Sequence, residues 1–470
     1  MAVPIELASL AFDPADARAA LDQLPVRPAV FALYGAEAHF EPYIGRTPNL
    51  RGRLERLLQP SAKHPRRLQL AGRVRQIRYR LTGSEFESLL VQFELLEKVH
   101  GTKCLERMHL RAPAFVRFLG SNAYPRITVT HRPGQREAEW AYGPFASRAA
   151  AERYAEEALK LFLLRRCTEE LDPHPSHPGC VYSEMKMCLA PCYQGCTDER
   201  YGEEAAAVEQ FLATRGESRL VQLRAQRDEA SANLEFEAAA AVHAQVQRVE
   251  SVRALAPELV RPLSQLRAVV LQASAEPGEV AVFLYENGRL SGPAPFSTLG
   301  MRIQNEQSGS TSLFAHPMAI EPVPEDAVPE QAAMRPDSGS GSCQGTTLVV
   351  PQMRQNRPGA LAPEETAPES ASAAPTPLEA TNDLPTKLAR GVLDARLDAV
   401  LATLAGQSQV PSSTLRQGHL ALLKRWYYRP EVRRAGEIFF PGPDGQWPVK
   451  AILRGVGRVA GKMFAAGDKE

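Results

Sequence analysis

The chain lacks both long apolar runs and a large excess of charge of one sign. None of its apolar runs approaches the roughly 20 residues that a membrane-spanning helix needs. Its first residues show no basic segment followed by an apolar run, so we expect no secretory signal and a cytoplasmic protein. The formal net charge is +1 over 470 residues. Any affinity for nucleic acid must therefore come from local patches of charge.

One long stretch also lacks aromatic residues. Phe314 is its only aromatic, and Pro, Ser, Gly, Ala and Glu dominate it. Such a composition cannot bury enough apolar surface to offset the entropy of the ordered chain. We therefore predict a long disordered linker over 304–383, followed by a small C-terminal region, 384–470.

Cysteine is scarce, yet five of the seven cysteines fall between Cys167 and Cys196. Four of them, Cys167, Cys180, Cys188 and Cys192, have the order C-x12-C-x7-C-x3-C, and the fifth is spare. Thiolates suit zinc or an iron–sulfur cluster, and four of them complete either site. Without a secretory signal, a disulfide knot is not expected. The spacing predicts a bound metal but does not separate zinc from a 4Fe-4S cluster.

Hydrophobic periodicity predicts a small α/β domain over residues 22–105. Ser84, with Glu87 three residues later, forms a capping box that opens the last helix of this domain. The predicted elements are strands at 29–34, 42–45 and 77–81 and helices at 49–58 and 84–96.

Further elements follow and give an α/β multidomain fold. A helix from about Ser147 to Leu164 leads into the cysteines, within a segment at 140–200. Two helical stretches that meet near Asn233 predict a helical hairpin at 215–254. Strands at 268–271 and 280–285, with the turn Glu286-Asn287-Gly288, predict a small sheet at 265–303. That sheet has too few strands to be stable alone.

Between Tyr43 and Arg80 there are eleven basic residues and one acid, Glu55. Arginine guanidinium groups match phosphate geometry, so a run with almost no compensating acid is typical of a polyanion-binding surface. The alternative is a solvated face. The predicted DNA-binding residues are Arg51, Arg56, Arg66, Arg67, Arg73 and Arg75.

The C-terminal region interleaves aromatic and basic residues from Leu422 to Arg429 and again from Arg433 to Phe440. Such a pattern can stack bases and hold phosphates. It can equally form a small core whose basic side chains reach the solvent at its rim.

Several motifs, in order, resemble a known family. The segments Leu24-Pro-Val-Arg-Pro-Ala-Val-Phe31 and Tyr43-Ile-Gly-Arg-Thr-Pro-Asn-Leu-Arg-Gly-Arg53 resemble the GIY-YIG nuclease module, most closely that of the bacterial excinuclease component UvrC and its shorter relative Cho. The similarity continues through Gly143-Pro-Phe-Ala-Ser147 and Leu161-Phe-Leu-Leu-Arg-Arg-Cys167 into the cysteines. It ends in Asn233-Leu-Glu-Phe-Glu-Ala-Ala239, which is similar to the UVR motif.

The resemblance implies a metal-dependent endonuclease of nucleotide excision repair. On this chain Tyr43 and Arg53 match catalytic positions of the module, and Arg46 stands where a Lys is common. Two positions depart from the motif of the nuclease module. Phe31 replaces a catalytic Tyr and has no hydroxyl to exchange a proton. Gln92 replaces the metal-binding Glu, and an amide is a weaker ligand than a carboxylate for Mg²⁺ or Mn²⁺.

The remaining implications concern cofactor and partner. In the family the four cysteines hold an iron–sulfur cluster, with zinc as the rival here. The hairpin would bind the damage-loading protein UvrB through Leu234, Phe236, Ala238 and Ala239. The sheet at 265–303 resembles only the opening strands of an RNase H-like nuclease domain. Three readings stay open: a DNA-binding repair factor with an impaired nuclease site, an active endonuclease that makes the 3′-side incision, and a general adaptor that uses the hairpin on another partner.

Overall fold

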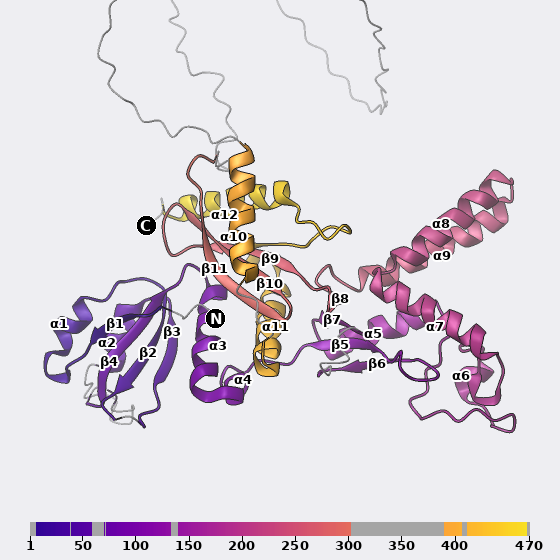
Figure 1. Ribbon diagram of the computed structural model, residues 1–470, viewed down its shortest axis with the longest axis horizontal. Helices are drawn as coiled ribbons and strands as arrows, with labels where there is room; N and C mark the ends of the chain where they lie inside the picture. Colours follow the sequence, from indigo (N-terminus) through magenta and orange to yellow (C-terminus); the bar gives the residue numbers. More distant parts are fainter. Residues whose placement is uncertain are drawn as a thin grey trace, which may run out of the picture. The chain divides into compact units, whose positions relative to one another are not determined.

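The computed structural model describes residues 6–37, 39–58, 70, 72–132, 140–301, 390–406 and 411–467. The predicted linker, Arg66 and Arg67 lie outside the described residues. Three four-stranded sheets organise the described part of the chain, so the fold is mixed α/β (Figure 1). None of the helices in this part combines the length and the apolar character needed to cross a bilayer.

The first sheet has the strand order β1-β4-β2-β3, and all its pairings are antiparallel. Its strands are β1 (Ala8–Ala11), β2 (Ala29–Gly35), β3 (Tyr43–Thr47) and β4 (Val74–Leu81), and the helices around it are α1 (Ala17–Asp22), α2 (Leu50–Leu58) and α3 (Glu85–His100). The expected strands and helices are confirmed, whereas β1 and α1 were not predicted. The Ser84 hydroxyl accepts a hydrogen bond from the Glu87 backbone N–H at 3.1 Å, which confirms the helix start.

The two faces of this sheet pack against different helices. Phe31 and Leu33 point toward α2 and form a core with Leu50, Leu54 and Leu58. On the opposite face, Val30 and Ile44 meet Val91 and Leu95 of α3. This division follows from the alternation of side chains along β2 and β3.

The middle sheet has the order β6-β5-β7-β8. Its strands are β5 (Ala114–Phe118), β6 (Ile127–Thr130), β7 (Ala141–Phe145) and β8 (Arg261–Pro262), and the helices between β7 and β8 are α5 (Arg148–Leu159), α6 (Val181–Glu184), α7 (Asp198–Ala213), α8 (Glu217–Ala232) and α9 (Phe236–Ala254). The helix expected to reach Leu164 ends at Leu159. The short helix α4 (Cys104–Arg107) precedes β5. The hairpin α8–α9 is present as predicted (Figure 1).

The third sheet corrects the expectation of a small remnant sheet at 265–303 separate from a C-terminal region at 384–470. Its strands are β9 (Ala268–Ala273), β10 (Glu279–Glu286), β11 (Arg289–Ser297) and β12 (Glu437–Phe439). The last of these pairs with β9. Residues on both sides of 302–389 therefore build one sheet, because β12 supplies the fourth strand.

Helices after residue 389 cover both faces of this third sheet. They are α10 (Arg390–Gly406), α11 (Ser413–Tyr427) and α12 (Val449–Gly467). Val269 and Leu271 pack against α10 and α12, and the alternate residues Ala268 and Val270 pack against α11 and α3. Thus α3 contributes to two cores, one with the first sheet and one with the third.

Candidate functional site

The position expected for a catalytic tyrosine is part of the core. Phe31 is 0% exposed, and its ring lies over Gly45 of the neighbouring strand, where an added Cβ would stand 2.8 Å from Phe31 Cζ. Its ring centroid is 6.1 Å from that of Tyr43. The aromatic contact between the two motifs is thus retained without the hydroxyl of the first.

Tyr34 does not replace the missing hydroxyl. It lies three residues beyond Phe31 on β2 and therefore points to the opposite face of the sheet. The guanidinium of Arg78 stacks on its ring at 4.8 Å. Tyr34 is thus engaged away from Tyr43, as the sequence indicates.

The expected catalytic residues divide between the two sides of β3. Tyr43 packs at the margin of the core that contains Phe31 and α2, and the half-buried Arg53 belongs to α2. Arg46, three residues beyond Tyr43, faces α3 and forms an ion pair with Glu85 at 3.4 Å. The structure therefore groups Tyr43 with α2 and Arg46 with α3.

Glu85 is held by a residue that no sequence signal connects to it. Arg429 donates two hydrogen bonds to its carboxylate, at 2.8 and 2.9 Å. The hydrogen bond from Arg429, together with the charges of Arg429, Arg46 and Arg425, lowers the pKa of Glu85. This carboxylate is a bidentate salt-bridge partner, which leaves it poorly suited to serve as a metal ligand near Gln92.

Glu94, two residues beyond Gln92 in the sequence, points toward α11. Its Oε1 lies 3.9 Å from Nε2 of the buried His419 of α11. Burial raises the pKa of Glu94, and burial also lowers the pKa of His419 to about 3. Gln92 itself is half-buried on α3. Neither Glu85 nor Glu94 therefore replaces the charge that Gln92 lacks, so Gln92 and these two carboxylates do not fit a divalent cation.

Some arginines of the basic run between Tyr43 and Arg80 bind the protein's own backbone and are therefore less available to DNA than the sequence suggests. Arg51 donates hydrogen bonds to the carbonyls of Asp22 and Leu24, both at 2.7 Å, and so ties α2 to the end of α1. Arg75 donates to the carbonyls of Gly72 and Val74. We therefore assign Arg51 a structural role. Arg56 and Arg73 remain exposed, and the latter stacks on Phe40.

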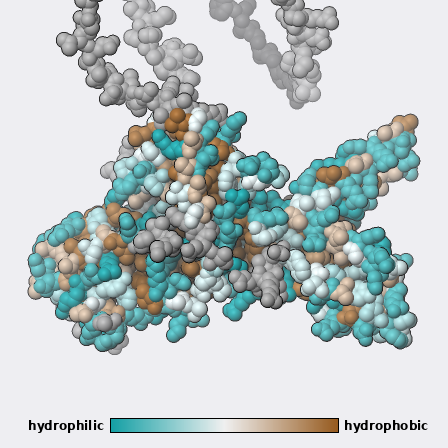
Figure 2. Space-filling view, viewed as in Figure 1, coloured by the Kyte–Doolittle hydropathy of each residue, from teal (hydrophilic) through white to brown (hydrophobic). Residues whose placement is uncertain are grey.

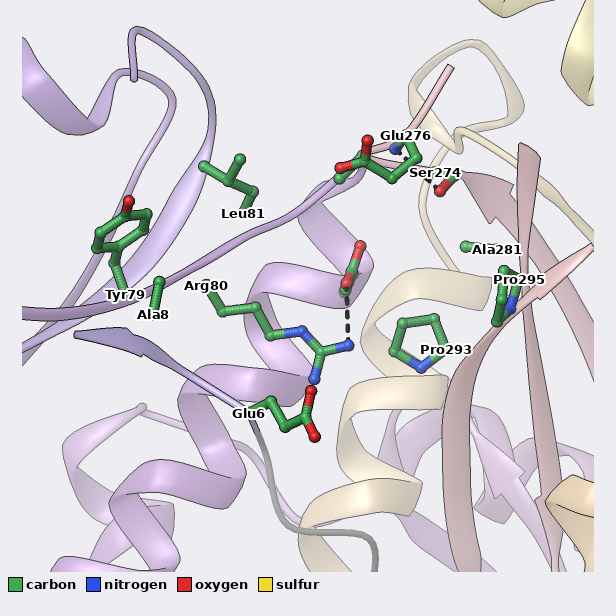
Figure 3. A pocket seen from close by; sticks show the side chains of 12 residues that line it. Glu6, Ala8, Tyr79, Arg80, Leu81, Ser274, Glu276, Ala281, Pro293 and Pro295 are labelled. Atoms are coloured by element: carbon green, nitrogen blue, oxygen red, sulfur yellow. Dashed lines mark hydrogen bonds and ion pairs between the residues drawn. The ribbon is translucent and has the colours of Figure 1, made fainter. Parts of the chain in front are cut away.

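Arg80 is neutralised inside a cavity of about 440 Å³ between β4, α3 and the third sheet (Figure 3). Its Nη2 lies 3.8 Å from Glu87 Oε1. Burial raises the pKa of Glu87, whose carboxylate accepts a hydrogen bond from the Gly83 N–H. Glu6 and Glu276 also line the cavity. With three carboxylates and one arginine along its walls, this space is unsuited to a phosphate group.

The cysteine segment is an irregular loop closed by backbone hydrogen bonds. The His174 N–H donates to the Cys192 carbonyl at 3.0 Å, and the Leu189 N–H donates to the Leu163 carbonyl at 2.9 Å. Cys167 Sγ accepts a long hydrogen bond from Arg165 at 3.6 Å. All six cysteines in the described residues are free thiols.

The four predicted metal-binding thiols influence one another electrostatically. Burial raises the pKa of Cys188, and the charges of Cys180, Cys192 and Cys167 raise it further. Within the described residues, no three His, Cys, Asp or Glu side chains are gathered closely enough to hold one metal ion. The set of four soft donors fits a thiolate-bound group by its chemistry.

The hairpin ends in exposed apolar side chains. Leu234 is 72% exposed and Phe236 is 67% exposed. Figure 2 shows apolar atoms at the outer end of α8 and α9. Ala238 is exposed and Ala239 is half-buried. These four residues, the hairpin tip, are therefore available to a partner.

The C-terminal aromatics form a packed cluster, so the core interpretation is the correct one of the two that the sequence allowed. Trp426 is buried and donates its indole N–H to the Ala435 carbonyl at 2.9 Å. The Tyr428 hydroxyl donates to the Pro144 carbonyl at 2.8 Å. Arg434 stacks on Trp426 and Tyr427. The hydrogen bond from Tyr428 attaches the end of α11 to β7 of the middle sheet.

Comparison with known proteins shows which family this chain resembles. Residues 115–211 match the family described as UvrC/Cho excinuclease, middle domain. The range begins in β5, contains all four predicted metal-binding cysteines and ends in α7. The chain is similar to UvrC proteins in this domain. No solved structure matches the chain at a significant level.

Three relatives show the extent of the UvrC-like similarity. The UvrABC system protein C of Alcanivorax borkumensis is 28% identical over 227 residues, which cover 48% of this chain and 37% of the relative. That of Ruminiclostridium cellulolyticum is 26% identical over 319 residues, 67% of this chain and 51% of the relative. That of Escherichia fergusonii is 28% identical over 241 residues, 51% of this chain and 39% of the relative. The chain thus spans between about a third and a half of the length of these relatives.

Proposed function

We propose that this UvrC-like chain is a bacterial nucleotide excision repair factor that binds DNA and a UvrB-like subunit and has an impaired GIY-YIG endonuclease site. The observation that carries the proposal is the state of the nuclease-like site. Phe31 is a buried core residue without a hydroxyl, and Gln92 brings no charge. Glu85 is held by Arg429 and Glu94 lies beside His419.

The loss of both groups affects one transition state. A general base contributes roughly 10²–10⁴-fold to a rate, and a metal ion contributes several kcal/mol of charge stabilisation. Arg53 and Tyr43 alone can position a phosphate, but they supply neither the general base nor the metal ion. Because the two losses concern a single reaction, their effects need not add.

DNA binding would use the exposed basic side chains of the first sheet and α2. Arg56 and Arg73 are exposed, and Arg66 and Arg67 follow α2 in the sequence. Such contacts are electrostatic and independent of base sequence.

The hairpin tip would bind the partner. Exposed apolar groups on a helical hairpin are a suitable anchor because their burial is favourable and because no other described residue covers them. In this proposal a matching helical hairpin of the UvrB-like partner packs over Leu234 and Phe236.

Cys167, Cys180, Cys188 and Cys192 would hold an iron–sulfur cluster, with zinc as the rival. Tetrahedral zinc with sulfur ligands at about 2.3 Å brings the sulfurs to within about 3.8 Å of one another. The charges of Cys180, Cys192 and Cys167 raise the pKa of Cys188, so the four thiols lie within electrostatic reach of one another. When bound, either group would cross-link the loop between α5 and α7.

The test measures binding and incision together. A labelled duplex with one bulky lesion is incubated with the chain, a UvrB-like subunit and Mg²⁺ or Mn²⁺. We expect a retained complex and no nicking beyond the background of an Arg53→Ala variant. Absence of a complex with DNA would contradict the binding half of the proposal. Nicking that disappears in the Arg53→Ala variant would identify the chain as an active 3′-side endonuclease.

A further inference from the structure

Helix α12 carries four basic residues and no acidic residue. Lys450, Arg454, Arg458 and Lys462 recur at intervals of four. Each interval advances about 6 Å along a helix and turns about 40° around it. The four cations therefore form a gently winding stripe about 18 Å long.

The stripe is fixed on the solvent side because the opposite side of α12 is in the core. Ile452, Val456 and Val459 are buried against Val269 and Leu271 of β9. All four basic side chains are exposed. The helix therefore cannot rotate its apolar face outward, as a helix that inserts into a lipid surface must.

Three of the four cations have no acidic partner among the residues that the structure describes. Arg458 donates to the Glu437 carboxylate at 2.7 and 2.5 Å. Lys450, Arg454 and Lys462 form no ion pair with any other described residue. An exposed row of unpaired cations on a rigid helix attracts a polyanion.

The surface along the stripe is also open. A Cβ added at Gly457, which follows Arg454 on the same side of the helix, would meet nothing within 4 Å. Duplex DNA carries one charge for about every 1.7 Å of its axis. A stripe about 18 Å long therefore faces roughly ten phosphates, enough for each cation to find a partner.

We propose that Lys450, Arg454 and Lys462 of α12 form a second contact surface for the phosphate backbone of double-stranded DNA. This surface is separate from the Arg56–Arg73 region of the first sheet, and the proposal rests on the DNA binding proposed above. Its recognition is independent of base sequence because it involves phosphates alone.

The test uses the full chain and a labelled undamaged duplex of random sequence, with binding measured from 0.1 to 1 M salt. The test variant is Lys450→Gln with Lys462→Gln. A control that removes one positive charge elsewhere is Arg248→Gln, at an exposed position of α9. A second pair, Gly457→Glu and Gly457→Gln, adds charge or only bulk at the open position. Circular dichroism melting confirms that each variant is folded.

Each lost phosphate contact lowers the slope of log K against log salt by about 0.9. The double variant should therefore lower the slope by about 1.8 and weaken binding roughly 60-fold at 0.1 M salt, with the loss vanishing toward 1 M. Gly457→Glu should weaken binding, and Gly457→Gln and Arg248→Gln should bind like the wild type.

Other outcomes separate the two proposals. If the double variant binds DNA as tightly as the wild type does, the proposal for α12 is wrong and the proposed DNA binding of the chain still stands. Absence of wild-type binding would overturn both. If the double variant loses affinity for anionic phospholipid vesicles or polyglutamate but keeps its affinity for duplex DNA, the surface serves a different partner and the inference is wrong.

Discussion

Gly418 offers the sharpest test of how the C-terminal helices join the rest of the chain. A Cβ at this position of α11 would overlap the end of the Phe93 ring of α3. Phe93 is 0% exposed, so its ring has no space into which to move. Overpacking of this kind costs about 1–3 kcal/mol, whereas replacing a helical glycine by alanine gains about 0.8–1.0 kcal/mol. We expect Gly418→Ala to lower the free energy of unfolding by up to about 2 kcal/mol.

Gly457→Ala is the matched control. It is the same substitution inside a helix of the same region, but nothing lies within 4 Å of the new Cβ. It should stabilise the protein by up to about 1 kcal/mol. Urea unfolding followed by tryptophan fluorescence is a suitable assay, because the Trp426 ring lies 5.4 Å from that of Phe86 of α3. If Gly418→Ala stabilises the protein as its control does, the packing of α11 on α3 is wrong.

Three further predictions follow from the described residues. Leu234→Ser with Phe236→Ser should leave the melting temperature unchanged, because both side chains are exposed, and should weaken capture of a UvrB-like subunit in a pull-down at least tenfold; equal capture would exclude the hairpin tip. Burial lowers the pKa of His419 to about 3 in the folded protein, so as the pH falls the unfolded chain binds a proton at this residue before the folded chain does. The contribution of His419 to the free energy of unfolding is therefore fully present above about pH 6.5. Below that pH it is lost by up to about 1.4 kcal/mol per pH unit. Glu94, whose pKa is raised, offsets part of this loss; denaturant midpoints from pH 7 to 5 should fall less in a His419→Gln variant, and equal slopes would contradict the assignment. Anaerobically purified protein should contain iron and sulfide, and Cys188→Ser with Cys192→Ser should lose them; zinc without iron by elemental analysis would favour the rival metal.

Local elements were predictable because their signals are local. The alternation in β2, the spacing of Leu50, Leu54 and Leu58, and the Ser84 cap each involve neighbours in sequence. The Asn287–Gly288 turn was found for the same reason: both residues have positive φ, as such a hairpin turn requires.

Long-range features were not predictable from one sequence. β12 has three residues and pairs with β9 across more than 160 positions, and so short a strand carries no periodicity. Arg429 and Glu85 are 344 residues apart, and neither is unusual in its own segment. Arg51 was predicted to contact DNA because composition does not show that its side chain binds two backbone carbonyls.

At the candidate site the sequence identified the altered positions but not their surroundings. Phe31 and Gln92 were visible as departures from a motif. The burial of Phe31 needed the structure because it depends on packing against α2. The engagement of Glu85 and Glu94 needed it because Arg429 and His419 lie far along the chain. These contacts are what make a substitute metal ligand unavailable near Gln92.

The most direct test of the central claim is a single-turnover nicking assay with Mn²⁺ on a labelled, lesion-containing duplex bound by a UvrB-like subunit. The account predicts no difference between the wild type and Arg53→Ala, each at the background rate, with both still bound to the duplex. A wild-type rate at least a hundredfold above that of Arg53→Ala would show that the site cleaves DNA despite Phe31 and Gln92, and would contradict the account.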